Sequence, residues 1–349
     1  PMRPTVFTLP WFDIPIRSYG LMLMIGFLGG TWWAMRRAQR TKCDPDLIVN
    51  LAFISLLSSV VGARIFYVVH YWDQHFAGRS IWDIVNITAG GLEFYGGFIG
   101  AFLAGSLYLY LKKVSYRLYA DICAPSIMFG MSMARIGCFL NGCCWGGPCP
   151  AEIPWSVQFP YSSSAYQREW TERLVTTPAE LVFVDNIGRV AYPLPREWIQ
   201  EAVEQKRPPG VVALHLRRFG MKPEELAQLA DQPQFRTIPL HPAQLYASMD
   251  GMLLAILLNA YFYRRKRHGT VFAMMLMLYP IMRVIEETIR VDNPQDTAGM
   301  TVSQFVSIVI FAVGLGMYLY LRTLPLRSPA AVPYVPPWEE KKAGARGRQ

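Results

Sequence analysis

The chain has 349 residues, of which 52% are hydrophobic and 17% are charged, and its formal net charge is +9. Soluble domains usually carry about 25% charged residues, so this composition favours a membrane protein. The Lys and Arg residues form short clusters beside apolar segments, without the interleaved aromatic residues of a nucleic-acid-binding stripe. We therefore expect no nucleic-acid partner.

The chain begins without the continuous apolar core of a cleavable signal peptide. Residues 1–18 are interrupted by prolines, arginines and an aspartate. The first long apolar segment is therefore expected to remain in the protein as a membrane span.

Seven segments are predicted to cross a bilayer, which takes about 20 mostly apolar residues. They lie at 19–36, 47–69, 94–111, 119–140, 243–263, 270–289 and 302–321. Basic clusters follow the first, third, fifth and seventh segments. Because basic loops stay on the cytoplasmic side, we expect an external N-terminus and a cytoplasmic C-terminus.

The fold class is thus an all-α polytopic membrane protein with seven transmembrane helices and a small α+β external head. The predicted parts are transmembrane helices one to four (1–141), the head (142–242), helices five to seven (243–323) and a disordered, Pro-rich cytoplasmic tail (324–349). Within the head we predict a hairpin, a helix, a strand and a second helix. They are placed at 181–194, 195–206, 210–219 and 222–230 respectively.

Several arginines lie inside the apolar segments, where ionisable side chains are costly and mark functional sites. Arg64, Arg135, Arg283 and Arg290 all fall toward the outer ends of predicted spans and have few matching acids. Arginine binds phosphate bidentately, so a phospholipid headgroup is the expected ligand. The alternative is structural pairing, which is strong for Arg283 with Glu287 four residues on and open for Arg64. Arg135 has no acid at helical spacing in its own span.

The glycines of residues 89–100 have two expected roles. Gly96 and Gly100 suit close packing of helices. Gly90 and Gly91 suit a tight turn that brings Tyr95 into the cavity.

Three cysteines follow the fourth span in the sequence CCWGGPC. Either Cys143 or Cys144 is expected to form a disulfide with Cys149 across the Gly-Gly-Pro turn. Free thiols remain an alternative, one of them a nucleophile beside Arg135. No metal is expected, because a fourth ligand is missing at ordinary spacing.

Seven motifs lie in a fixed order along the chain. The main one is ARIGCFLNGCCWG (134–146). The others are IRSYGLML (16–23), GARIFYV (62–68), GGLEFYGGFIG (90–100), HPAQLYAS (241–248), RVIEETIRVDN (283–293) and SQFVSI (303–308). In sequence and order these motifs resemble those of the bacterial prolipoprotein diacylglyceryl transferases, and the main one resembles the family signature. The resemblance does not extend to motifs in the head or the tail.

This resemblance implies a seven-span enzyme of the bacterial inner membrane, active as a monomer without a cofactor. It implies transfer of the diacylglyceryl group from phosphatidylglycerol to the lipobox cysteine thiol of a preprolipoprotein, with release of glycerol-1-phosphate. Its partners would be that lipid, the lipobox segment and membrane lipids.

The resemblance also implies roles for individual residues. The catalytic set would be Arg135, Arg283, Tyr95, His241 and Tyr19, with the two arginines holding the departing phosphate. The substrate-binding set would be Arg64, Asn141, Gly146, Gln244, Tyr246, Glu287 and Arg290.

The chain departs from the family pattern at three of these motif positions. Tyr95 replaces the histidine taken as the base, Cys138 replaces an asparagine and Cys143 replaces a glutamate. Two further functions therefore stay open. One is a non-enzymatic phospholipid-binding or transport homologue, and the other is a membrane thiol oxidoreductase that uses the outer cysteines.

Overall fold

The structure is a computed structural model that describes residues 5–9, 14–78, 80–87, 90–184, 191–204, 210–291 and 299–335. The chain divides into two compact units. The first unit is Pro1–Gly26, Met131–Met252 and Tyr279–Val309, and the second is Phe27–Gly130, Leu253–Leu278 and Ile310–Gln349. Each unit is described by itself below.

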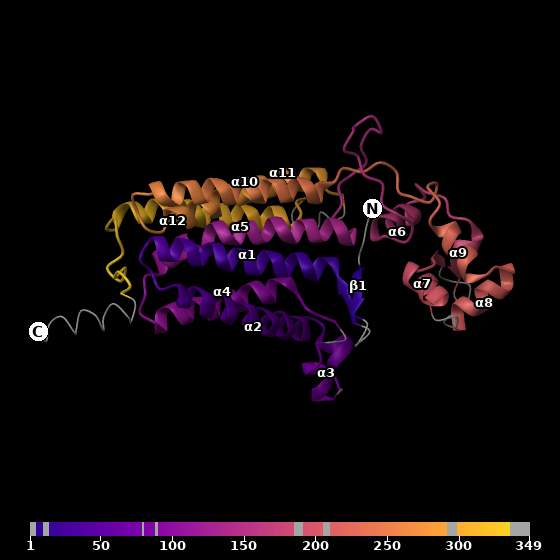
Figure 1. Cartoon of the computed structure of the whole chain (residues 1–349), viewed down its shortest axis with the longest axis horizontal. Helices are drawn as coiled ribbons and strands as arrows, with labels where there is room; N and C mark the ends of the chain where they lie inside the picture. The colour runs from indigo at the N-terminus through magenta and orange to yellow at the C-terminus, as the bar shows by residue number, and fades with distance from the viewer. Residues whose placement is uncertain are drawn as a thin grey trace, which may run out of the picture. The chain divides into compact units, whose positions relative to one another are not determined.

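Seven helices of 18 or more residues occur in the described part of the chain, one for each predicted span. They are α1 (Ser18–Arg40), α2 (Pro45–His70), α4 (Phe94–Leu111), α5 (Tyr116–Asn141), α10 (Ala243–Arg264), α11 (Thr270–Ile289) and α12 (Val302–Thr323). The predicted helices are therefore confirmed, and Figure 1 shows them as long ribbons.

Five of these helices (α2, α4, α5, α10 and α12) are long and apolar enough to cross a membrane. The other two are as long but more polar. Helix α11 carries Arg283, Glu286 and Glu287, and α1 is diluted by glycines and ends in arginines. The apolar character of the chain thus marks five candidate spans among the described residues.

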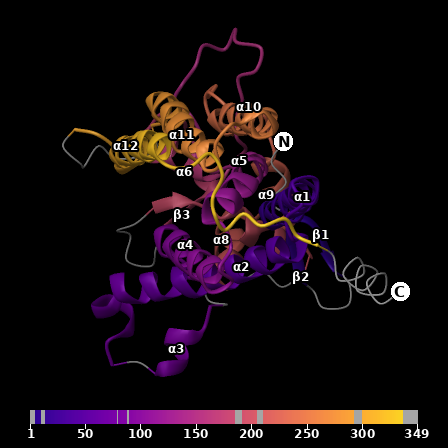
Figure 2. The same ribbon diagram turned by 90° about the vertical axis from the view of Figure 1, so that its left-hand side faces the viewer.

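Helices α2 and α4 of the second unit lie side by side, as Figure 1 and Figure 2 both show. Glycines form their contact. A Cβ atom added at Gly62 would lie 2.4 Å from the backbone oxygen of Gly96 and 3.1 Å from the Cα of Gly100. Only hydrogen fits in this contact, so the prediction that Gly96 and Gly100 serve close helix packing is confirmed.

A buried acid ties three segments of the second unit together. Asp121 on α5 is fully buried and pairs with Arg265, with 3.0 Å between Oδ2 and Nε. Its two carboxylate oxygens also accept hydrogen bonds from the backbone N–H groups of Gly269 (2.7 Å) and Phe272 (3.0 Å). Asp121 therefore caps the N-terminus of α11 from a neighbouring helix, which is a structural role.

The head contains the predicted hairpin and both predicted helices. Strands β3 (Val182–Val184) and β4 (Ala191–Pro193) pair antiparallel, and the tip at 185–190 lies outside the described residues. Helix α7 (Arg196–Glu204) follows Pro195, and its predicted last two residues also fall outside that range. Helix α9 (Pro223–Ala230) begins at its proline. These predictions are confirmed.

The predicted strand at 210–219 is wrong, because Gly210–Phe219 is helix α8. The valines suggested a strand, but Val212 and Leu216 are both buried and lie four residues apart, which is the helical spacing. His215 on the same helix lies 2.6 Å from the carbonyl oxygen of Glu180. Tertiary burial outweighed the local β preference here.

Several short elements were not predicted. In the head they are α6 (Ser164–Thr171), capped by the Ser163 side chain, and the 3₁₀ turn η2 (Ala179–Leu181). Strands β1 (Thr5–Leu9) and β2 (Ile14–Arg17) form an antiparallel pair before α1.

Two further short elements follow α2, namely the π-helix η1 (Trp72–Phe76) and helix α3 (Ile81–Val85). In the predicted tail, residues 324–335 contain neither helix nor strand, and 336–349 lie outside the described residues.

Candidate functional site

Arg135 lies on the last turns of α5 in the first unit and is half-buried. It forms neither an ion pair nor a hydrogen bond with the residues that the structure describes. Its positive charge nevertheless acts on Glu286 and Tyr279 of α11 and on Tyr19 of α1. The guanidinium therefore sits among polar groups of other helices while its own donors stay available.

Arg283 is in a different state. Its guanidinium contacts Glu287 at 2.9 Å, Glu286 at 3.5 Å and the Ser303 hydroxyl at 3.0 Å. Arg283, Glu286 and Glu287 are buried, and Ser303 is partly buried. The structural alternative considered for Arg283 and Glu287 is thus the arrangement present in the structure. Ser303 was not among the predicted site residues, although it lies in the SQFVSI motif.

Arg64, in the second unit, donates hydrogen bonds to backbone carbonyls. Nε donates to Ile84 (2.7 Å), one terminal nitrogen to Gly90 (2.8 Å) and Gly91 (3.0 Å), and the other to Asp83 (2.6 Å). Arg64 therefore holds the segment between α2 and α4 in place. The structural role that the sequence left open is the one realised here.

The predicted turn before α4 is also present. Gly90 and Gly91 have φ values of +87° and +78°, which residues with a side chain rarely adopt. They lead to Tyr95, which is 42% exposed in the first turn of α4. Close by, Nδ1 of His70 lies 3.1 Å from Glu93. That pairing joins residues 23 positions apart, so sequence spacing gave no sign of it.

Gly146 lies in a crowded place in the first unit. Its N–H donates to the carbonyl of His241 (3.0 Å), and it forms an isolated β-bridge with Arg290. A Cβ atom added at Gly146 would lie 2.7 Å from that carbonyl oxygen and 2.8 Å from the Cβ of His241. Glycine at this position thus brings together the loop after α5, the segment just before α10 and the residue that follows α11.

The start of α10 supplies polar side chains to the same region. The Tyr246 hydroxyl lies 3.3 Å from Nδ1 of His241 and accepts a hydrogen bond from Nε1 of Trp155 (2.8 Å). Gln244 is 1% exposed and donates through Nε2 to the carbonyl of Cys143 (2.8 Å). Its Oε1 is buried without a hydrogen-bond partner among the described residues. Trp155 was not among the predicted site residues, and no motif in the sequence pointed to it.

Two further predicted residues lie beside these groups. Tyr19, at the start of α1, packs against Gly137, since a Cβ added there would meet the tyrosine ring at 3.0 Å. Asn141, the last residue of α5, has its amide nitrogen 3.7 Å from the sulfur of Cys143.

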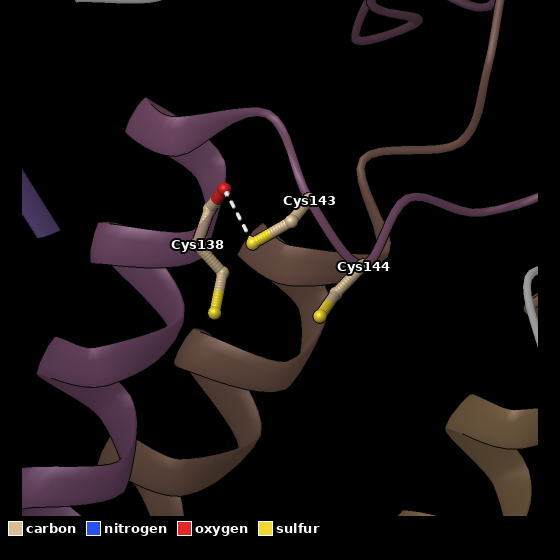
Figure 3. A group of neighbouring side chains, drawn as sticks. All are labelled: Cys138, Cys143 and Cys144. Atoms are coloured by element: carbon tan, nitrogen blue, oxygen red, sulfur yellow. Dashed lines mark hydrogen bonds between the residues drawn. The ribbon is translucent and has the colours of Figure 1, made fainter. Parts of the chain in front are cut away.

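Three thiols gather at the end of α5, as Figure 3 shows. The sulfur atoms of Cys138, Cys143 and Cys144 all lie within 4.8 Å of one another. All six cysteines are free in the structure, so neither Cys143 nor Cys144 forms the predicted disulfide with Cys149. The backbone turn at Gly142 (φ +73°) and Cys144 (φ +62°) directs the chain back toward Cys138.

The three thiols and the nearby arginines set the charge of the cluster. Hydrogen bonds from Cys138 and Cys143 lower the pKa of the Cys144 thiol, and the charges of Arg290 and Arg135 lower it further. The direction of this pKa shift is opposite to the one that burial alone gives a thiol.

A comparison with protein families decides what kind of chain this is. The family model described as prolipoprotein diacylglyceryl transferase matches residues 4–320. The chain belongs to the prolipoprotein diacylglyceryl transferase family. The match runs through the head, where the sequence motifs gave no indication of membership.

Individual members of the family show how far this chain has diverged. A protein of Rhodopirellula baltica is 27% identical over 368 residues, covering 88% of this chain and 73% of its own. One of Photorhabdus laumondii is 27% identical over 322 residues, covering 91% of each chain. One of Erwinia tasmaniensis is 25% identical over 329 residues, again covering 91% of each. All three are named phosphatidylglycerol–prolipoprotein diacylglyceryl transferase.

Proposed function

We propose that this chain transfers the diacylglyceryl group of phosphatidylglycerol to the lipobox cysteine thiol of preprolipoproteins and releases glycerol-1-phosphate. Membership of the family and the names of the relatives support this activity. The observation that carries it is Arg135, a half-buried guanidinium near the end of an apolar helix without an ion pair among the described residues. Such a group suits an anion that arrives from the bilayer, and a phospholipid phosphate is that anion.

The reaction breaks one bond and forms another at the glyceryl carbon that carries the phosphate ester. The thiolate sulfur forms the C–S bond, and the C–O bond to phosphate breaks with its electron pair on oxygen. Negative charge therefore accumulates on the departing phosphate, and Arg135 would stabilise it by charge-assisted hydrogen bonds. Arg290 would add positive charge to the same region, since its charge acts on Cys144.

The other residues would position the substrates rather than take part in bond making. Arg283 is already paired with Glu286 and Glu287, so it would fix α11 and, through Glu286, the neighbourhood of Arg135. Tyr19, Asn141, His241, Gln244 and Tyr246 would contact the headgroup or the lipobox segment. Gly146 would keep the loop close enough for those contacts.

We further propose seven membrane spans in the bacterial inner membrane, with an external N-terminus, a cytoplasmic C-terminus and a monomeric protein. Helices α1 and α11 would be the two additional spans, because each has at least 20 residues. The basic residues at the end of α1 and directly after α10 support the orientation.

The proposal is tested with purified protein, phosphatidylglycerol micelles and a lipobox peptide. We expect release of glycerol-1-phosphate and a peptide mass increased by one diacylglyceryl group. A peptide with serine in place of the lipobox cysteine is the matched control and should give neither product. Lipid binding without release in the presence of the cysteine peptide would instead favour a non-enzymatic lipid-binding protein, and complementation of a transferase-deficient strain would separate the two in cells.

A further inference from the structure

The thiol cluster of Cys138, Cys143 and Cys144 has the dimensions of a metal site. Two thiolates bound to one zinc ion at about 2.3 Å lie about 3.8 Å apart in tetrahedral geometry. The three sulfur atoms here all lie within 4.8 Å of one another, so a shift of at most about 1 Å completes the site. Figure 3 shows the side chains of Cys143 and Cys144 extending from the loop after α5 toward the part of α5 that carries Cys138.

The loop is held in the shape that brings these sulfurs together. The N–H of Cys143 donates to the carbonyl of Cys138 (3.1 Å), and Gln244 donates to the carbonyl of Cys143 (2.8 Å). Cys144 adopts a φ of +62°, which is costly for a residue with a side chain. The buried Oε1 of Gln244 has no hydrogen-bond partner among the described residues, so it is one further polar atom that a ligand bound here can satisfy by donating a hydrogen bond.

Among the described residues, no further His, Cys, Asp or Glu joins this group of ligands. Three protein ligands and an open fourth position are typical of catalytic zinc, whereas structural zinc has four protein ligands. Soft thiolates select zinc over the hard cations magnesium and calcium.

We propose that Cys138, Cys143 and Cys144 bind a zinc ion whose fourth position takes the lipobox cysteine thiol of the substrate. This proposal rests on the proposed function and adds the means by which the nucleophile forms. A free thiol has an ordinary pKa of about 8.5 and is mostly protonated at neutral pH. A thiol that coordinates zinc loses its proton outright.

The step balances without an added oxidant or reductant. The lipobox thiol displaces water from zinc and gives its proton to solvent. The zinc-bound sulfur then uses a lone pair to form the C–S bond at the glyceryl carbon, while the C–O bond breaks and its electron pair leaves with the phosphate. The thioether product is neutral and a weak ligand, so water replaces it and the site is restored.

The first experiment measures metal binding by the intact protein in detergent. Metal-free protein is titrated with Co²⁺ and then with Zn²⁺. We expect one Co²⁺ per chain with a thiolate-to-cobalt charge-transfer band, which zinc removes. The variants Cys138→Ser and Cys144→Ser should each weaken binding by more than about 100-fold, since even changes outside the ligand set cost about 10- to 100-fold. Cys149→Ser, a buried free cysteine in the same loop, is the matched control and should bind normally.

The second experiment measures transfer by the same samples. Metal-free protein should lose at least about 100-fold in rate, since removal of one stabilising group in an active site already costs that much, and added zinc should restore it. Thermal unfolding and phosphatidylglycerol binding of each variant verify that the protein remains folded.

Full transfer activity after metal removal, or in Cys144→Ser, would overturn the zinc proposal and leave the proposed function standing. A disulfide among the three cysteines in active protein would overturn it as well. Stoichiometric zinc binding without any transfer would instead overturn the proposed function and, with it, the role of the open position.

Discussion

Two arginines within apolar helices, Arg64 on α2 and Arg135 on α5, have opposite surroundings. Four backbone carbonyls accept hydrogen bonds from Arg64, and the rings of Tyr67 and Phe76 lie against its guanidinium. Arg135 has no such partner among the residues that the structure describes. In the sequence both are charges toward the outer ends of apolar segments, with a structural role open for Arg64 and no acid at helical spacing for Arg135.

An arginine in an apolar segment is therefore not by itself a ligand site. Arg64 has a structural role because backbone carbonyls of the segment between α2 and α4 accept hydrogen bonds from its guanidinium. Arg135 suits an external anion because the neighbouring helices supply charge and hydroxyls but no ion-pair partner. The role of each arginine is thus inferred from whether its guanidinium N–H groups already donate to protein acceptors. Substitutions can test this inference.

The largest effect is expected for Arg135→Gln. Loss of the guanidinium should lower the rate of diacylglyceryl transfer by about 10²- to 10³-fold, the usual cost of removing one stabilising donor from a transition state. Thermal unfolding should be almost unchanged, since no ion pair is lost. Steady-state release of glycerol-1-phosphate measures the first quantity. Arg173→Gln, on the exposed surface of the head, is the control and should match the original protein. An Arg135→Gln protein with normal rates would remove the contrast between the two arginines.

Arg64→Lys should act on stability instead. Lysine keeps the charge but cannot reach four carbonyls from a planar fork, so we expect a loss of about 3 kcal/mol in the free energy of unfolding. Urea denaturation in detergent measures this, and limited proteolysis between residues 71 and 93 should become faster. The transfer rate per folded molecule should change less than for Arg135→Gln. The reverse ranking of the two variants would show that Arg64 acts on substrate.

Gly146→Ala separates loop placement from chemistry. The added methyl would lie 2.7 Å from the His241 carbonyl oxygen, so the loop must move, at a cost of about 1–3 kcal/mol. We expect a lower transfer rate together with a lower unfolding temperature. The matched control is Gly20→Ala on α1, where nothing lies within 4 Å of the added atom. Equal behaviour of the two variants would mean that the close approach at Gly146 is unimportant.

The smallest effect concerns Glu169 in the head, a buried acid with no expected catalytic role. Burial raises the pKa of Glu169 to about 6 from 4.5. The folded protein therefore holds this proton more tightly than the unfolded chain, so stability is greatest below pH 4.5 and falls as the pH rises through 6. The difference amounts to about 1–2 kcal/mol. In Glu169→Gln this part of the pH dependence should disappear from thermal unfolding curves, while the exposed Glu197→Gln should keep it.

The sequence by itself determined the long helices and most of the head. Seven apolar runs gave seven helices because helix length and apolar content are properties of a continuous segment. The sequence also predicted close helix packing at Gly96 and Gly100, because their spacing of four residues places them on one face of a helix, whereas their partner Gly62 was found only in the structure. Helix α8 was predicted as a strand because its valines favour that conformation. Only the burial of Val212 and Leu216, four residues apart, decides for the helix.

The tertiary structure alone decided the state of each functional side chain. In the structure Arg64 donates to backbone carbonyls and Arg283 pairs with two acids, whereas Arg135 has no partner among the described residues. It also placed Cys143 and Cys144 with Cys138, although their spacing in sequence suggested a bridge to Cys149. The physical reason is that a residue's chemical state depends on the partners within about 4 Å of it, and those partners come from segments far away along the chain.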